Sequence, residues 1–581
     1  MIDNSTPEFR VVPLDDLPPL FALLERIKVA SIFDQLIPQH PNWVGALSFG
    51  QVVAGWQVYI LSECDHRLNH VQGWVEQRQD VYSACLNSAV RPLDFSDDRL
   101  ADVLDKLSEA ETWSKFESQL NQQIIRVYDL NPQRVRLDPS TISTYAPVNE
   151  KGLLRLGHSK DGRPEDAQLK FQLGMLDPLG LTLVTKVVAG KSADDPLYAP
   201  AIRQVQAGIG AGGKTYVGDV KMAALATRLQ LVRSGDYYLC PLGEKQLSRE
   251  QREALIARAL RGEVKLRPIK RERLDPLGIK PTVIEEIAEG YEMSVPMVAV
   301  DNKRVVRWKE RRLVIRSHAY ARAEAARLEE RLSRAASEIG DLQARKQGKR
   351  RLNKKQTEQA AAEAIARHGV EGLLEATITM KTSKRKVRGY KDRPARTRTE
   401  RSPVVTIERH EAAIKEVKER MGWRVYATNH RDLSLSEGVL AYREQYRIED
   451  GISRLKGRPL GLAPMFLQTE SRMIGLINLL TIALRVLTLF EFQVRGGLKA
   501  KGQTLKGIYA GQKGRQTARP STELMLEAFQ GIDAVVGKVK GELVSYLRPL
   551  TETQKRILSL LGLDDRLYDK LLSYFQNLTP E

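Results

Sequence analysis

The segment from residue 134 to residue 242 constrains the fold most, because its apolar pattern alternates between strand and helix. It begins with a strand rich in β-branched residues. Two apolar runs then flank the turn Asp177-Pro178-Leu179-Gly180, which is typical of a hairpin. The expected elements are a strand at 134–145, the hairpin at 169–188, a helix at 197–208, a strand at 215–220, a helix at 221–235 and a strand at 236–242. Strands that alternate with helices in this way predict an α/β layer architecture.

Helical patterns lie before and after this segment. Apolar residues at spacings of three and four predict helices near the N-terminus and again near the C-terminus. We therefore expect five regions. They are a helical N-terminal domain at 1–125, the first part of a core at 126–245, an insertion at 246–420, the last strand and a helix of the core at 421–495, and a basic linker with C-terminal helices at 496–581.

The insertion contains a strand at 291–300 and a helix with a heptad seam. The seam residues recur at alternating spacings of four and three: Ala321, Ala325, Leu328, Leu332, Ala335, Ile339 and Leu342. A break at 347–355 and a second helical stretch at 356–369 predict an antiparallel helical hairpin. The seam then packs inside the hairpin or joins two copies of the chain, and we expect the first. The segment 381–398 is expected to be an exposed loop.

The charge of the chain indicates a polyanionic partner, nucleic acid before membrane. The formal net charge is +19 at pH 7. Residues 1–120 contain 9 Lys and Arg against 18 Asp and Glu, so a net charge of −9 there leaves +28 for the rest. Two basic runs, 303–316 and 381–398, are candidates for phosphate contact. The alternative for each run is a solvated face without a partner.

No feature of the sequence predicts a membrane protein. The most apolar run, 474–490, is interrupted by Asn478 and Arg485, so we expect a buried helix. The first residues lack the basic and apolar segments of a secretory signal. The 3 cysteines are too few and too scattered for a disulfide framework. We therefore expect a cytoplasmic protein.

Three acidic residues stand at places where a site could form. Asp138 and Asp219 each end an expected strand, and Glu449 lies on the helix that follows the insertion. Carboxylates brought together from different elements are the ligands that Mg²⁺ prefers. An alternative remains open for both aspartates: Asp138 could cap a turn before Pro139, and Asp219 could cap a helix that begins at Lys221.

The stretch from Tyr442 to Lys456, YREQYRIEDGISRLK, places Tyr442, Glu449 and Lys456 seven residues apart. Seven residues are close to two helical turns, so an unbroken helix would align these side chains in one stripe. A solvated helix face is the simpler interpretation. The stretch resembles the YREK signature of bacterial insertion-sequence DDE transposases, which reads Tyr, two residues, Arg, three residues, Glu, six residues, Lys. The Arg position is Gln445 here.

This resemblance implies an α/β RNase H-like catalytic core with a helical N-terminal domain, a large helix-containing insertion and C-terminal helices. It also implies that Asp138, Asp219 and Glu449 are the catalytic acids and the ligands of two Mg²⁺ or Mn²⁺ ions per active site. Magnesium would activate the attacking oxygen and stabilise the leaving oxygen of a phosphodiester.

The resemblance further implies that Tyr442 and Lys456 contact the DNA backbone near the cleaved end. Gln445 stands at the Arg position of that contact and cannot make the charged, forked interaction of an arginine. The additional candidates for DNA binding are Arg447, Arg454, Arg458, Lys384, Arg385, Lys386 and Arg388.

The expected function is that of a cut-and-paste transposase. Its partner would be double-stranded DNA, both the terminal inverted repeats of the element and the target, and its synaptic complex would contain a homodimer. Two alternatives remain: a nuclease of the same fold that cuts without joining, and a repurposed or inactive relative that only binds DNA. The departure at Gln445 is the feature that favours an inactive relative.

Overall fold

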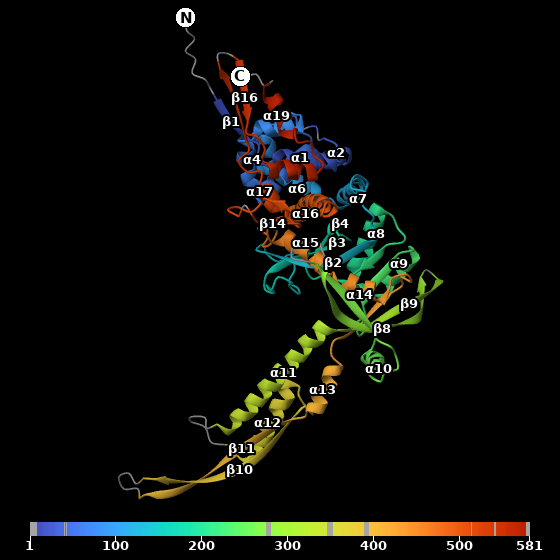
Figure 1. Cartoon of the computed structure of the whole chain (residues 1–581), viewed down its shortest axis with the longest axis vertical. Coiled ribbons are helices and arrows are strands. Elements are labelled where there is room, and N and C mark those ends of the chain that lie inside the picture. Colours follow the sequence, from blue (N-terminus) through green and yellow to red (C-terminus); the bar gives the residue numbers. More distant parts are fainter. Residues whose placement is uncertain are drawn as a thin grey trace.

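The computed structural model describes residues 9–39, 41, 43–274, 281–301, 303–344, 352–388, 394–512, 514–539 and 542–576. A nine-stranded mixed sheet lies at its centre, with the strand order β4-β3-β2-β5-β6-β12-β9-β8-β7 (Figure 1). The strands are β2 (Arg134–Thr144), β3 (Ala167–Asp177), β4 (Leu181–Ala189), β5 (Thr215–Val217), β6 (Tyr237–Pro241), β7 (Arg267–Leu274), β8 (Pro281–Asp301), β9 (Arg304–Ser317) and β12 (Trp423–Thr428). The protein is therefore a mixed α/β protein with a large sheet and many helices.

Five of these strands come from the segment that the sequence analysis singled out. β2, β3 and β4 pair antiparallel, and β5 and β6 follow on the other side of β2 in parallel. Helix α8 (Asp195–Ile209) connects β4 to β5, and helix α9 (Leu225–Arg233) connects β5 to β6. The predicted order of strand, hairpin, helix, strand, helix and strand is confirmed.

The other four strands extend the sheet beyond β6. β12 pairs antiparallel with both β6 and β9, and β8 pairs antiparallel with β9 and β7. The basic run 303–316 thus lies in β9, inside the sheet. Two of its arginines serve the fold: Arg311 donates to the carbonyl of Leu433, and Arg316 donates to the carbonyl of Met421.

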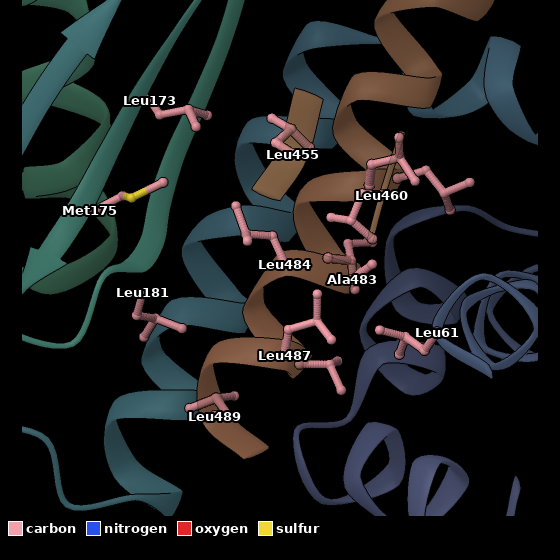
Figure 2. Close-up of a cluster of buried hydrophobic side chains, with 14 of the residues drawn as sticks. Leu61, Leu173, Met175, Leu181, Leu455, Leu460, Ala483, Leu484, Leu487 and Leu489 are labelled. Carbon is pink, nitrogen blue, oxygen red and sulfur yellow. The ribbon is translucent and has the colours of Figure 1, made fainter. Parts of the chain in front are cut away.

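A long apolar helix, α16 (Glu470–Ala500), packs between the sheet and the N-terminal helices. Figure 2 shows Leu484 and Leu489 of α16 on the side of β3 and β4, while Leu61 of α3 (Phe49–Glu63) lies across the helix. The window from this helix that is apolar enough to cross a membrane is 94% buried inside the protein. The predicted buried helix is confirmed, and its apolar surface is accounted for by packing.

The N-terminal helices are α1 (Leu17–Arg26), α2 (Val29–Leu36), α3, α4 (Leu68–Glu76), α5 (Gln79–Leu86), α6 (Asp97–Leu107) and α7 (Ala110–Val127). Of these, α3 and α6 pack against α16, and α1 and α5 pack against the C-terminal helix α19 (Leu567–Gln576). The C-terminal helices α17 (Thr522–Glu527) and α18 (Glu552–Leu560) pack against α16. One cluster of buried side chains runs through the N-terminal helices, the sheet and the C-terminal helices. The five-region division stays a prediction.

The C-terminal part contains helices, as predicted, and also strands that the sequence did not predict. α16 continues to Ala500, and β13 (Leu505–Lys506) pairs with β14 (Gln516–Thr517). Beyond them β15 (Asp533–Val539) pairs with β16 (Glu542–Leu547) and with β1 (Phe9–Pro13) from the other end of the chain. The strands β15 and β16 were not predicted, and β15 pairs on one side with a strand that is more than 500 residues away.

The part of the insertion that follows β9 forms an arm that extends away from the sheet (Figure 1). It consists of α11 (His318–Gly340), α12 (Lys354–His368), the paired strands β10 (Leu374–Val387) and β11 (Arg396–Arg409), and α13 (Glu411–Glu419). The predicted helical hairpin is confirmed. Seam residues Leu328, Leu332 and Ile339 are buried within the arm, so the seam packs intramolecularly.

The prediction of an exposed loop at 381–398 was wrong for the described residues of that segment. Residues up to Val387 belong to β10, and residues from Arg396 belong to β11, in continuous register from Leu374↔Arg409 to Val387↔Arg396. The pattern of Lys, Arg and Thr carries no alternation of apolar and polar residues. The strand state arises instead from cross-strand pairing that begins where Leu374 and Ile378 are buried.

Candidate active site

The first of the three acids, Asp138, lies inside β2, where it pairs in register with Leu173 of β3, so the prediction that it ends a strand was wrong. Side chains alternate along a strand, so Asp138 shares a face with Arg136, and helix α15 (Tyr446–Lys456) packs on β2 and β3. The pKa of Asp138 rises from 3.8 to about 7. Burial is the main cause, the Lys160 ammonium opposes the shift, and the charges of Asp219 and Glu449 add to it.

Asp219 follows the end of β5 and is held by hydrogen bonds. Its Oδ1 accepts from the hydroxyl of Tyr198 at 2.7 Å and from the backbone N–H of Lys221 at 2.8 Å. The second contact caps a short 3₁₀ turn, Val220–Ala223, so the capping role considered from sequence is real. It coexists with a position beside Asp138. Tyr198, on α8, was not singled out from sequence, because its role depends on the α8–β5 packing.

Glu449 lies in the first turn of α15 and is exposed. The helix approaches β3 closely at Gly451, where an added Cβ would lie 2.5 Å from the Cε atom of Met175. Met175 lies directly opposite Arg136, and Asp138 is two residues further along the same strand. Met175 and Asp138 are therefore on the same face of the sheet. A glycine two residues after Glu449 therefore brings the backbone of α15 down onto the face that carries Asp138.

The single helix expected from Tyr442 to Lys456 is two helices. α14 (Leu435–Arg443) ends before a turn at Glu444 and Gln445, and α15 begins at Tyr446. Tyr442 is therefore on a different helix from Glu449 and Lys456, and the one-stripe prediction was wrong. The Tyr442 ring packs 4.5 Å from the ring of Tyr426, centroid to centroid, in the core.

An ion cluster from distant parts of the chain holds this bend. Arg136 is buried and donates to the carbonyl of Ala441 and, at 2.9 Å, to Asp177 Oδ2. Arg447 donates to the carbonyl of Pro178 at 2.9 Å and to Glu444 Oε1 at 3.1 Å. Spacing within the helix does not reveal these contacts, because Arg136 and Asp177 come from β2 and β3. They fix the direction of α15 relative to the sheet.

The three acids are neighbours, but their side chains do not meet at one point. Within the described ranges, no group of three His, Cys, Asp or Glu side chains is close enough to hold a metal ion. In the same part of the chain, no side chain or backbone group donates a hydrogen bond to the carboxylate of Asp138 or Glu449. A fourth acid, Asp194, also raises the pKa of Asp138 and pairs with Lys170 at 2.6 Å.

These features fit a cation ligand set in donor chemistry. Asp138 and Glu449 lack a hydrogen-bond donor among the described residues, and the negative charges of Asp219 and Glu449 oppose ionisation of Asp138. Oxygen ligands of this kind suit Mg²⁺ and Mn²⁺. The binding of two metal ions and the catalytic roles of the three acids stay predictions.

Lys456 is not free in this structure. Its Nζ atom lies 2.6 Å from Asp161 Oδ1, and its side chain is 16% exposed. The Asp161 carboxylate also accepts from the backbone N–H of Ser143 at 3.1 Å. A loop between β2 and β3 thus lies beside the three acids, with Lys160 near Asp138 and Asp161 on Lys456. Sequence reasoning missed this loop because its residues gave no periodic signal.

The other predicted DNA-binding residues lie in three places. Gln445 is at the bend, and its side-chain oxygen is buried with no hydrogen-bond donor in the described part of the chain. Arg447 holds the bend through its hydrogen bond to the carbonyl of Pro178. Arg454 forms ion pairs with Glu491 and Glu523. Arg458 is exposed. The exposed residues Lys384, Arg385, Lys386 and Arg388 lie on the arm or directly after β10. The structure therefore does not bring all of these residues together.

No family model matches the chain, and no curated protein matches it in sequence. Over nearly its whole length the chain is structurally similar to a piggyBac transposase, seen by cryo-EM in a synaptic complex with hairpin DNA. The similarity has a TM-score of 0.36 and 10% sequence identity, and it covers 98% of this chain and 89% of that chain. A similarity of this degree does not establish membership of a family.

Proposed function

We propose that the chain is a DNA transposase of a bacterial insertion sequence, which cuts DNA at the ends of the element and joins those ends to target DNA. One observation supports this above all others. β2, the end of β5 and α15 bring Asp138, Asp219 and Glu449 close enough for two of the charges to raise the pKa of the third. A carboxyl group whose pKa is raised by burial and by neighbouring carboxylates is typical of a functional site.

The arrangement of strands supports an RNase H-like core. In the order β4-β3-β2-β5-β6, three antiparallel strands are followed by two that run parallel to β2. Asp138 lies on β2, Asp219 lies just after β5, and Glu449 lies on α15, which follows the insertion. This is the placement that the resemblance to the YREK-type DDE transposases implies.

Asp138, Asp219 and Glu449 would hold two Mg²⁺ or Mn²⁺ ions. When bound, such ions activate an oxygen nucleophile and neutralise charge on the leaving oxygen. The chain itself supplies the orientation: the Tyr198 hydroxyl fixes one oxygen of Asp219, and the strand fixes Asp138. Lys160 supplies a positive charge beside Asp138 that favours its ionised form.

The remaining parts of the proposal concern partners and location. Double-stranded DNA, both transposon ends and target, would be the substrate, and a homodimer would hold two ends together. The net charge of +19 supports a nucleic-acid partner. The protein would act in the bacterial cytoplasm, at the nucleoid when bound to DNA.

The test is cleavage and strand transfer with Mg²⁺ on a DNA fragment that carries the flanks of the gene. The variant Glu449→Gln should lose both reactions, whereas Asp450→Asn, one residue further along the same helix, should keep them. Wild-type cleavage without joining would indicate a nuclease. Equal activity of wild type and Glu449→Gln would remove the acids from the reaction.

A second candidate is a relative that binds DNA without cutting it. Two observations favour it: within the described ranges the acids do not form a three-ligand group, and Gln445 replaces the expected arginine. It predicts DNA binding with no Mg²⁺-dependent product, and binding that is equal in wild type and Glu449→Gln.

A further inference from the structure

The end of the arm is a two-stranded ribbon with no covering layer. Near its base, Leu374, Ile378 and Val405 are buried against α11 and α12. The distal ribbon, defined here as Lys381–Val387 of β10 and Arg396–Ser402 of β11, lies beyond that cover (Figure 1). All seven of its β10 residues are exposed, as are Arg396 to Thr399 of β11. Both faces of the distal ribbon are therefore open to a partner.

Both faces are also basic. Residues directly opposite in an antiparallel pair share a face, and successive residues alternate between faces. The register places Lys381, Arg385, Arg396 and Arg398 on one face, and Lys384, Lys386 and Arg401 on the other. Glu400 is the one acid of the distal ribbon, and it lies 3.7 Å from Arg398. Apart from Val387, the other residues are serine and threonine.

This composition is costly for an isolated ribbon. Arg385 lies directly opposite Arg398, and like charges in that position destabilise a strand pair. A two-stranded hairpin without an apolar face is marginally stable in water. The sequence thus keeps a repulsive, exposed ribbon that contributes nothing to the core, which is the pattern of a surface built for a polyanion.

Duplex DNA is the polyanion that fits. A two-stranded β-ribbon fits the major groove of B-form DNA, where basic side chains on both faces reach the two flanking backbones. The major groove of A-form RNA is too narrow for side chains to read. An anionic membrane would favour apolar anchors, and Val387 alone is apolar in the distal ribbon. Lysine, arginine, serine and threonine are also the side chains that contact phosphates.

The length of the arm separates this contact from the acids. α11 begins where β9 ends, and Ile339 near its other end packs with Ile378 of β10. The 22 residues from His318 to Ile339 span about 30 Å of helix. The strand from Ile378 to Val387 adds about 30 Å. The distal ribbon therefore reaches about 60 Å beyond the sheet, which corresponds to well over one turn of DNA.

We propose that the distal ribbon is a second DNA-binding site, which inserts into the major groove of a duplex more than one helical turn from Asp138, Asp219 and Glu449. It binds without sequence preference, through phosphates. The placement of these acids at the cleaved bond rests on the proposed function; the binding of DNA by the ribbon does not.

The test compares two double variants of the full chain with equal loss of charge. Arg385→Gln with Arg398→Gln alters the distal ribbon, and Arg322→Gln with Arg327→Gln alters the exposed face of α11 in the same arm. Binding is measured by fluorescence anisotropy on duplexes of about 14 and about 40 base pairs. The salt concentration is varied between about 50 and about 200 mM, because the slope of log affinity against log salt gives the number of phosphate contacts.

The ribbon variant is expected to bind the long duplex about 10- to 60-fold more weakly at 0.1 M salt. Its slope of log affinity against log salt should fall by about 2, from the loss of two phosphate contacts. The short duplex, little more than one turn of DNA, can occupy only one of the two sites. Wild type should therefore bind the long duplex more tightly than the short one, and the ribbon variant should lose this difference in affinity. The α11 variant should match wild type. In urea, the ribbon variant should be as stable as wild type or more so, because a like-charge pair is removed.

Equal weakening by both variants would overturn the proposal, since net charge alone would explain it. So would unchanged binding by the ribbon variant, or wild-type binding to anionic vesicles but not to DNA. Failure here is distinct from failure of the proposed function. Normal DNA binding by the ribbon variant, with cleavage lost in Glu449→Gln, would refute the ribbon site and support the proposed transposase function. DNA binding that depends on the ribbon, with no cleavage by wild type, would support the ribbon site and refute the transposase function.

Discussion

Replacement of Asp138 by asparagine should make the metal-free protein more stable at pH 8. The pKa of Asp138 is raised from 3.8 to about 7, so the folded protein holds a proton there that the unfolded chain releases. A group of this kind stabilises the fold fully below pH 3.8, and its contribution is lost as the pH rises through 7. Asparagine has no such dependence.

The size of the effect follows from the shift. About three pKa units at 1.36 kcal/mol each correspond to at most about 4 kcal/mol. Because the unfolded Asp138 is already ionised at pH 5, only about two of these units lie between pH 5 and pH 8, so we expect a change of about 2–3 kcal/mol between these pH values. The free energy of unfolding in urea, with a chelator present, is measured for wild type and Asp138→Asn at pH 5 and pH 8. The variant should gain relative to wild type between the two pH values, while it loses Mg²⁺-dependent cleavage.

A double-mutant cycle tests the cause. Because the charge of Asp219 raises the pKa of Asp138, the gain from Asp138→Asn at pH 8 should shrink in an Asp219→Asn background. Loss of stability at pH 8 in Asp138→Asn would refute the reasoning, since it would mean that the ionised carboxylate is satisfied in the fold. An undiminished gain in the double variant would remove Asp219 as a cause.

Two further predictions concern charge pairs. Glu117→Ala should lower the free energy of unfolding by about 3–5 kcal/mol, because Arg485, fully buried and 2.6 Å from Glu117, loses its counter-charge. Glu111→Ala, on an exposed pair, should leave the free energy of unfolding close to that of wild type in the same urea titration. Asp161→Asn should free Lys456 for a phosphate and steepen the salt slope of short-duplex binding by about 1. An unchanged slope would mean that Lys456 does not contact DNA.

The order of elements from β2 to β6 could be predicted because each strand carries its own apolar signal. β3, for example, is buried at every position from Ala167 to Asp177, and its hairpin turn is marked by Pro178 and Gly180. The three-stranded sheet β1-β15-β16 could not, because its central strand β15 pairs on one side with Phe9–Pro13 at the other end of the chain. Pairing across such a separation leaves no local pattern to read.

The candidate site shows the same division. Asp219 and Glu449 could be proposed because the end of β5 and a helix are visible in the sequence, and Asp138 because the strand that carries it is visible. The bend at Glu444 could not, since the seven-residue spacing suits an unbroken helix. It is imposed by Arg136 and Asp177, which lie about 300 residues earlier and act through charge and hydrogen bonds. Likewise the Lys456–Asp161 pair arises from a loop with no periodic pattern.

The three acid side chains stay apart because each is held in a different way. Hydrogen bonds fix Asp219 and the strand fixes Asp138, whereas Glu449 is exposed and has no hydrogen-bond donor among the described residues. Ordering one glutamate side chain costs about 1.5–2 kcal/mol. Glu449 is therefore the acid whose side chain would have to move for the proposed cation site to form, because Asp138 and Asp219 are already held in place.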